Sequence, residues 1–151
     1  MKIFLAGAVS FAPNTHVDKF KIYEKTIKDF YPNAELTTPD IIWDYRDKCI
    51  KEHPNFSIPQ INHLMTDFDL EKVKDCDVMI CDASVQSTGF GLELGVTLEN
   101  KKRVVFFYEK GSKISNMLTG AFINSNFVEY EKVEDIERLL NQFLTNLKLG
   151  V

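Results

Sequence analysis

Short stretches rich in β-branched and aromatic residues alternate along the chain with longer stretches of helical periodicity, and this alternation restricts the fold more than any other feature. The stretches expected to be strands are Lys2–Ala6, Glu35–Thr38, Val78–Cys81, Val104–Tyr108 and Phe127–Tyr130. The segments expected to be helices are Val17–Phe30, Ile58–Lys74, Gly91–Asn100, Ile114–Phe122 and Val133–Leu147. Strands that alternate with helices form parallel sheets covered on both faces. The sequence therefore predicts an α/β fold with a five-stranded, mostly parallel sheet in flavodoxin-like or Rossmann-like arrangement.

Length and composition limit the number of domains and the kinds of partner that this chain can have. A chain of 151 residues, 44% of them hydrophobic, can supply one full core, so residues 1–151 are expected to form one domain. The net charge of −4, without a polybasic run, argues against nucleic acid or an anionic membrane as partner. The N-terminal "KIFLAGA" is unlike a signal peptide, and the three cysteines lack CxxC spacing. We expect reduced thiols and a cytoplasmic location.

Ligands of parallel sheets bind beyond the carboxyl ends of the strands. Three segments are expected there: "GAVSFAPN", "DASVQSTGFGLE" and "EKGSKISN". The poorly periodic stretch from Asp40 to Pro59 is expected to be a loop or lid beside the site. Trp43, Tyr45 and Phe11 are candidates to stack on a nucleobase, although aromatic residues of a lid are as often core residues.

Two kinds of cofactor site do not fit the sequence. The glycines at 89, 91 and 95 imitate a dinucleotide fingerprint, but its third glycine would fall at Leu94. The three histidines lack the spacing that places two imidazoles on one helical face. We therefore expect neither a cofactor nor a metal.

Glu93 is the most distinctive polar residue of the third strand-end segment. If a helix begins near Thr88–Gly91, Glu93 lies in its first turn, where the helix dipole stabilises a carboxylate. An ordinary dipole-matching or capping role explains that position equally well. The hydroxyls of Ser87 and Thr88 and the amides at Gly89 and Gly91 could hold a phosphate at the helix N-terminus.

The stretch "DLEKVKDCDVMICDASVQSTGFGLELG" resembles the core of the nucleoside 2-deoxyribosyltransferase superfamily, most closely its nucleoside 5'-monophosphate N-glycosidase branch of CMP and 2'-deoxynucleotide N-hydrolases. The resemblance extends from "KIFLAG" to "ISNMLTG". It implies that Glu93 is a nucleophile that attacks the anomeric carbon and forms a sugar ester. It also implies that Asp69, 24 residues earlier, orients or protonates the departing base. Spacing alone does not place Asp69 beside Glu93.

Two serines favour a phosphorylated substrate within this resemblance. Ser87 stands where nucleoside transferases usually carry an aspartate and matches the hydrolase serine that contacts the 5'-phosphate. Ser115, with Asn116 and Met117, matches the hydrolases' Ser-x-Met, whose serine reaches the same phosphate from a neighbouring subunit. The resemblance thus implies a homodimer or larger homo-oligomer with shared sites. Ser115 also fits a helix N-cap.

Two positions depart from the hydrolase pattern. Hydrolases carry an arginine shortly after the glycine that matches Gly7, whereas Ser10 stands there in a transferase-like "SFAPN". Lys110 or Lys113 could supply the missing positive charge. Phe4 replaces the family's usual tyrosine, which leaves room for a ribose 2'-OH; simple core packing explains Phe4 as well.

The function predicted is hydrolysis of the N-glycosidic bond of a nucleoside 5'-monophosphate, with CMP or 5-hydroxymethyl-CMP favoured, through a covalent ester on Glu93. One alternative is a nucleoside 2-deoxyribosyltransferase that exchanges bases, and another is a 2'-deoxynucleotide N-hydrolase. A non-catalytic nucleotide sensor is the alternative from another class. The pair Asp69 and Glu93 argues against it, because a phosphate binder gains nothing from two carboxylates near an anion.

Overall fold

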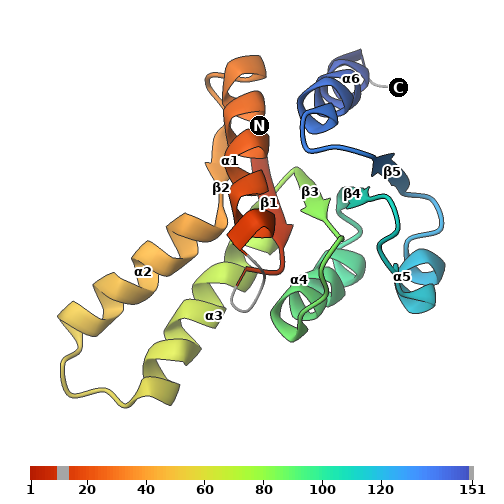
Figure 1. The fold of residues 1–151 in the computed structure, drawn as a ribbon. Coiled ribbons are helices and arrows are strands. Elements are labelled where there is room, and N and C mark those ends of the chain that lie inside the picture. The colour runs from red at the N-terminus through yellow and green to blue at the C-terminus, as the bar shows by residue number, and fades with distance from the viewer. Residues whose placement is uncertain (10–13, 150–151) are drawn as a thin grey trace.

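The computed structural model describes residues 1–9 and 14–149, without the side chains of residues 14–17. Its elements are β1 (Lys2–Gly7), α1 (Asn14–Phe30), β2 (Glu35–Thr37), α2 (Pro39–Glu52), α3 (Ile58–Asp75), β3 (Val78–Asp82), α4 (Thr88–Glu99), β4 (Arg103–Glu109), α5 (Asn116–Ala121), β5 (Asn126–Tyr130) and α6 (Asp135–Leu149). The five strands form one sheet in the order β2-β1-β3-β4-β5, and every neighbouring pair is parallel. The predicted flavodoxin-like α/β fold is confirmed (Figure 1).

Helices cover both faces of this sheet, because side chains alternate between the faces along each strand. Ile3 and Leu5 of β1 belong to the core cluster that α1 and α6 cover. Phe4 and Ala6 belong to the opposite cluster, which α3 and α4 cover. Every residue of the central strand β3 is buried, which explains its unbroken apolar run.

The stretch from Asp40 to Pro59 was expected to be a loop or lid beside the site; the expectation of an irregular loop was wrong, although Ile42 and Trp43 do line the cavity described below. Most of that stretch is helix α2, which begins at Pro39 and forms a hairpin with α3 that extends away from the sheet (Figure 1). Proline suits the first turn of a helix because it lacks the amide hydrogen that would stay unpaired there. Only Ile42 and Cys49, two turns apart, are fully buried along α2. A helix that packs chiefly on one neighbour needs so few apolar residues that its sequence shows little periodicity.

The remaining elements match the predicted ones within a few residues at their ends. The largest shift at a site residue concerns α4, which begins at Thr88 rather than Gly91. Ser87 is its N-cap, and the Ser87 hydroxyl oxygen accepts a hydrogen bond of 3.2 Å from the Phe90 amide. Among the described residues, no helix has the length and apolar character needed to cross a membrane.

Candidate active site

A cavity of about 110 Å³, here called the strand-end cavity, lies at the carboxyl end of β1. Residues of β1, α2, α3 and α4 form most of its wall. The lining residues are Phe4, Leu5, Ala6, Gly7, Val9, Pro39, Ile42, Trp43, Met65, Asp69, Gly89 and Glu93. The cavity therefore brings together the two carboxyl groups that stand far apart in the sequence.

Asp69 and Glu93 form a carboxyl pair inside this cavity. Asp69 comes from α3 and Glu93 from α4, and a hydrogen bond joins the two side chains. Oδ1 of Asp69 and Oε2 of Glu93 are buried and have no hydrogen-bond partner among the described residues. Buried polar atoms are nearly always paired in folded proteins. Two carboxyl groups that line one cavity, each with an unpaired buried oxygen, indicate a site built for a ligand rather than for stability.

Burial dominates the ionisation of this pair. Burial raises the pKa of Glu93 well above its ordinary value, and the Asp69 charge and hydrogen bond raise it further. Burial also raises the pKa of Asp69, to about 6, against the opposing effect of the hydrogen bond from Glu93. Burial and the contact between the two groups therefore favour a proton on the pair, in a hydrogen bond from Glu93 to Asp69. Such an arrangement supplies one carboxylate and one acid within the same cavity.

The predicted position of Glu93 in the first helical turn was wrong. Because α4 begins at Thr88, Glu93 lies in the second turn, and no acidic residue stands in the first. The favourable effect of the helix dipole falls off within the first turn. The raised pKa of Glu93 agrees with this correction, since a carboxylate stabilised by the dipole would have a lowered one.

Phe4 and Gly7 of β1 form the floor of the strand-end cavity. Phe4 is 2% exposed and also packs in the α3–α4 core cluster, so its cavity and core roles coexist. Gly7 leaves no space for a side chain: a Cβ atom there would lie 2.6 Å from the Phe20 ring and 2.9 Å from the Asp82 carbonyl oxygen. Only glycine lets the ends of β1 and β3 approach so closely.

The predicted phosphate-binding residues fall into two places. Gly89 lines the strand-end cavity together with the carboxyl pair. Ser87 and Gly91 instead line a second depression of about 390 Å³ between α4 and α5, here called the α4–α5 groove. Ser87 is the N-cap of α4, two residues before Gly89, so the start of this helix contributes residues to both depressions.

Ser115 and Met117 lie in the α4–α5 groove rather than beside the carboxyl pair of their own chain. Ser115 is the N-cap residue of α5, as expected, but its hydroxyl makes no capping hydrogen bond. Asn116 is exposed at the first position of α5. Met117 is 85% exposed. The structure thus separates this predicted group from the carboxyl pair within one chain.

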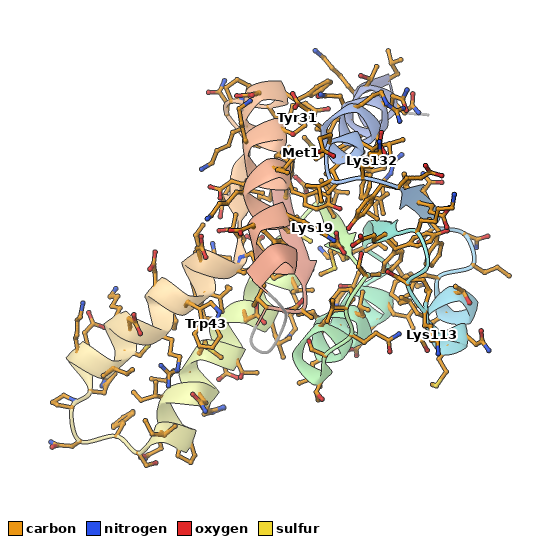
Figure 2. All side chains as sticks on the ribbon, in the orientation of Figure 1. Met1, Lys19, Tyr31, Trp43, Lys113 and Lys132 are labelled. Atoms are coloured by element: carbon orange, nitrogen blue, oxygen red, sulfur yellow. The ribbon has the colours of Figure 1, made fainter. Side chains whose placement is uncertain are left out.

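Two predicted residues, Ser10 and Phe11, lie outside the described residues. Of the two lysines considered as phosphate partners, Lys110 forms an ion pair with Glu131. Lys113 is exposed, and its carbonyl oxygen accepts a hydrogen bond of 2.7 Å from the Gln86 side chain, next to Ser87 (Figure 2).

Several cavity residues were missed by the sequence analysis. Met65 lies one helical turn before Asp69 on α3, so helical spacing from Asp69 could have identified it. Pro39 and Ile42 belong to the first turn of α2, whose helix was not predicted. Trp43, from the same turn, was named as a stacking candidate and does line the cavity.

Neither His53 nor His63 lines the strand-end cavity. His63 pairs with Asp67 at 3.5 Å, and the ring of His53 stacks on Phe56. Within residues 1–9 and 14–149, no group of three or more histidine, cysteine, aspartate or glutamate side chains is placed to hold a metal ion.

Comparison with curated proteins supports the resemblance drawn from the motif, although no protein-family model matches the chain. A Nematostella vectensis protein predicted to be a 2'-deoxynucleoside 5'-phosphate N-hydrolase is 37% identical over 52% of this chain and 56% of its own length. The 5-hydroxymethyl-dUMP N-hydrolase of Tetraodon nigroviridis is 30% identical over 60% of this chain and 66% of its own length. The aligned region thus spans less than two thirds of either relative.

Solved structures agree at the level of the fold. A CMP N-glycosidase from Clostridium botulinum superposes with a TM-score of 0.62 at 17% identity, over 93% of this chain and 99% of that one. A 2-deoxyribosyltransferase from Bacillus psychrosaccharolyticus gives a TM-score of 0.63 at 23% identity, over 91% of this chain and 90% of that one. These structures share the fold, and the sequence similarity to nucleotide N-hydrolases agrees with the resemblance of the motif to the nucleoside 2-deoxyribosyltransferase superfamily.

Proposed function

We propose that this protein is an enzyme that hydrolyses the N-glycosidic bond of nucleoside 5'-monophosphates, with Glu93 as nucleophile and Asp69 as acid and base. The observation that carries the proposal is the carboxyl pair of Asp69 and Glu93, which lines the strand-end cavity and in which each side chain has a buried oxygen without a hydrogen-bond partner among the described residues. Strongly perturbed carboxyl groups in a cavity are typical of catalytic sites. A nucleotide sensor would gain nothing from two such groups, because they would repel the phosphate.

The singly protonated pair matches the needs of this reaction. Glu93 attacks C1' as a carboxylate while the proton of the pair passes through Asp69 to the departing base, so the base leaves neutral. The C1'–N bond breaks and an ester forms between Glu93 and C1'. Water then attacks C1', gives its proton to Asp69 and frees Glu93. The transition state resembles an oxocarbenium ion, which a neighbouring carboxylate stabilises before bonding to it.

Ser87 supports a phosphorylated substrate. Its hydroxyl oxygen already accepts the Phe90 amide, so its hydrogen remains available to donate to a phosphate oxygen. The sequence relatives are named for hydrolysis of deoxynucleoside monophosphates. On both grounds we favour a nucleoside 5'-monophosphate over a free nucleoside.

For the sugar and base, we propose a cytidine-type ribonucleotide, CMP or 5-hydroxymethyl-CMP. Phe4 lines the cavity without a hydroxyl that would compete for the space of a ribose 2'-OH. Pro39, Ile42, Trp43 and Met65 add an apolar wall against which a pyrimidine can pack. The names of the relatives support the alternative, a 2'-deoxynucleotide, and a base-exchange reaction remains the second alternative.

We also propose that the active enzyme is a homodimer or larger homo-oligomer. Ser115 lines the α4–α5 groove together with Ser87, and the resemblance implies that a serine at this position reaches the substrate phosphate of a neighbouring copy. Exposed apolar side chains flank this groove, notably Leu98, Met117 and Ile123. A second copy would bury them and complete both sites at once.

The proposed activity is tested with a panel of ribo- and deoxynucleosides and their 5'-monophosphates, with release of free base as the measurement. Glu93→Ala should lower base release at least about a thousandfold, because the covalent route is lost. Glu99→Ala, at an exposed glutamate of the same helix, is the matched control and should retain full activity. Base release by folded Glu93→Ala at the rate of the control would overturn the assignment.

Two further measurements separate the variants of this reaction. Mass spectrometry of the acid-quenched enzyme should find a sugar phosphate on the peptide that contains Glu93. A second base, added in excess, should not appear in a new nucleotide. Efficient formation of that nucleotide would instead identify a transferase.

A further inference from the structure

A second buried carboxylate lies at the end of β3 and takes no part in the proposed reaction. Asp82 is fully buried. Its Oδ2 accepts hydrogen bonds of 2.9 Å from both the Tyr23 and the Tyr130 hydroxyls. Its Oδ1 accepts one of 3.0 Å from the Ser84 amide. Both carboxylate oxygens of Asp82 accept hydrogen bonds, whereas each side chain of the carboxyl pair has an unpaired oxygen. This difference indicates that Asp82 has a structural role.

These partners connect elements that are distant in the sequence. Tyr23 belongs to α1 and Tyr130 to β5, while Asp82 ends β3. Lys19, also on α1, extends the cluster: its ammonium group donates to the Tyr130 hydroxyl at 3.0 Å and pairs with Glu109 at the end of β4 (Figure 2). We call these five residues with Ser84 the Asp82 network. It ties helix α1 to the carboxyl ends of three neighbouring strands.

Ser84 is the point at which the network holds the loop of residues 83–87, which joins β3 to α4. The Ser84 amide donates to Asp82, and the Ser84 hydroxyl lies 3.1 Å from the Tyr130 hydroxyl. The same hydroxyl accepts a hydrogen bond of 2.8 Å from the Glu109 amide. Three bonds therefore hold one residue at the start of the loop. The loop ends at Ser87, and α4 carries Gly89 and Glu93 from there into the cavity.

The placement of this loop decides where the reacting groups lie. Glu93 must meet Asp69, which stands on the separate helix α3, and a displacement of less than 1 Å at a reacting group is costly. Asp82 also touches the cavity floor, since its carbonyl oxygen blocks the space beside Gly7. The Asp82 network thus lies directly behind the surface that the substrate would contact.

We propose that Asp82 is a positioning residue, which holds the β3–α4 loop so that Ser87 meets the substrate phosphate and Glu93 meets the sugar. The proposal rests on the proposed function for its kinetic consequences, but not for its structural ones. Asp82 acts through Ser84, and it touches neither substrate nor reacting atoms.

The decisive variant is Asp82→Asn. Asparagine has nearly the same shape as aspartate, but one of its two acceptor oxygens is replaced by an NH2 group. That group would face a hydrogen of the Ser84 amide or of a tyrosine hydroxyl, and the hydrogen bond would be lost. We expect kcat to fall and KM for the monophosphate to rise, with kcat/KM reduced about tenfold or more, as for other losses of a buried charge-assisted hydrogen bond. Amide hydrogen exchange across residues 84–88 should accelerate. Tyr130→Phe removes one partner with less disturbance and should change all three measurements in the same direction, by less.

Tyr31→Phe is the matched control. The Tyr31 hydroxyl donates to the Leu144 carbonyl at 3.3 Å, so this variant removes a tyrosine hydrogen bond between the residue that follows α1 and helix α6. Figure 2 shows Tyr31 and Lys19 toward opposite ends of α1, and Tyr31 is thus remote from the loop. This variant should leave KM and the exchange of residues 84–88 unchanged. A variant that merely reduced the folded fraction would lower kcat without raising KM.

The outcomes separate this proposal from the proposed function. If the wild-type protein releases no base from any nucleotide, the proposed function fails, and hydrogen exchange alone still tests Asp82. If Asp82→Asn and Tyr130→Phe both fold and leave KM and loop exchange at wild-type values, Asp82 is not a positioning residue, whatever the activity. If Asp82→Asn does not fold, Tyr130→Phe decides.

Discussion

At the scale of single residues, the proposed catalytic pair of Asp69 and Glu93 lowers the free energy of unfolding near neutral pH. The pKa values of Asp69 and Glu93 are both raised in the folded protein, from 3.8 to about 6 for Asp69 and well above 4.5 for Glu93. The folded state therefore binds more protons than the unfolded state above about pH 4, and its free energy of unfolding falls as the pH rises through these pKa values. Near neutral pH the pair destabilises the fold.

Replacement of Glu93 with glutamine should therefore give an inactive but more stable protein. Glutamine stays neutral at every pH and can still donate a hydrogen bond to Asp69. At pH 7.5 we expect Glu93→Gln to raise the free energy of unfolding, and the difference should shrink toward about pH 4. Urea denaturation from pH 4 to 8 measures it. Glu99→Gln, exposed on the same helix, should show no such trend, and a Glu93→Gln protein less stable than wild type at pH 7.5 would contradict this account.

Phe4 offers a test of the sugar preference. Wild-type enzyme should use CMP at least as well as dCMP, and Phe4→Tyr should lower the ratio of kcat/KM for CMP over dCMP about tenfold, because the new hydroxyl competes with the ribose 2'-OH. Phe127→Tyr is the control, because Phe127 packs against the same core cluster as Phe4 but does not line the cavity. A wild-type preference for dCMP that does not change in Phe4→Tyr would support a deoxynucleotide substrate.

The limits of sequence reasoning are clearest at these residues. Asp69 and Glu93 stand on different helices, so local spacing could not pair them, and only the resemblance to a family linked them. The helix-dipole argument predicted a stabilised carboxylate, whereas burial gives the opposite sign. Burial of one side chain depends on what the rest of the chain places around it, and no local pattern contains that information.

At the scale of elements, the α2–α3 hairpin supplies the apolar wall of the strand-end cavity. The five strands were predicted from their apolar and β-branched residues, which the helices cover. Five helices were predicted from the periodicity of the apolar residues that they bury. Helix α2 escaped prediction because it buries little beyond Ile42 and Cys49. Its functional residues, Pro39, Ile42 and Trp43, consequently lay in a segment expected to be irregular.

Trp43 tests the role of α2. Trp43→Ala should lower kcat/KM for the monophosphate about tenfold, because stacking on an aromatic ring contributes about 1–3 kcal/mol per base. Ile41→Ala is a matched control on the same helix, since Ile41 is 39% exposed and Trp43 38%, but only Trp43 lines the cavity. Equal kinetic losses in both variants would show that α2 acts only through its packing.

At the scale of the whole molecule, the proposed oligomer predicts complementation. Glu93→Ala lacks the nucleophile and Ser115→Ala lacks a phosphate contact, so each pure variant has defective sites. In mixed oligomers some sites combine an intact Glu93 with an intact Ser115 from the neighbour. Mixing the two variants after brief unfolding should therefore restore part of the wild-type kcat/KM at low substrate. No recovery from a mixture that forms mixed oligomers would place Ser115 outside the neighbour's site.

The sheet order carries a consequence for how the enzyme matures during synthesis. From β3 onward each new strand joins the same edge of the sheet, in the order in which the ribosome delivers it. The residues that line the strand-end cavity all precede Asn100, whereas Glu109 and Tyr130, which fasten the loop behind it, come later. A nascent chain thus carries every reacting group before it can hold them in place. On the proposed function and the proposed role of Asp82, base release should begin only when the final strand docks.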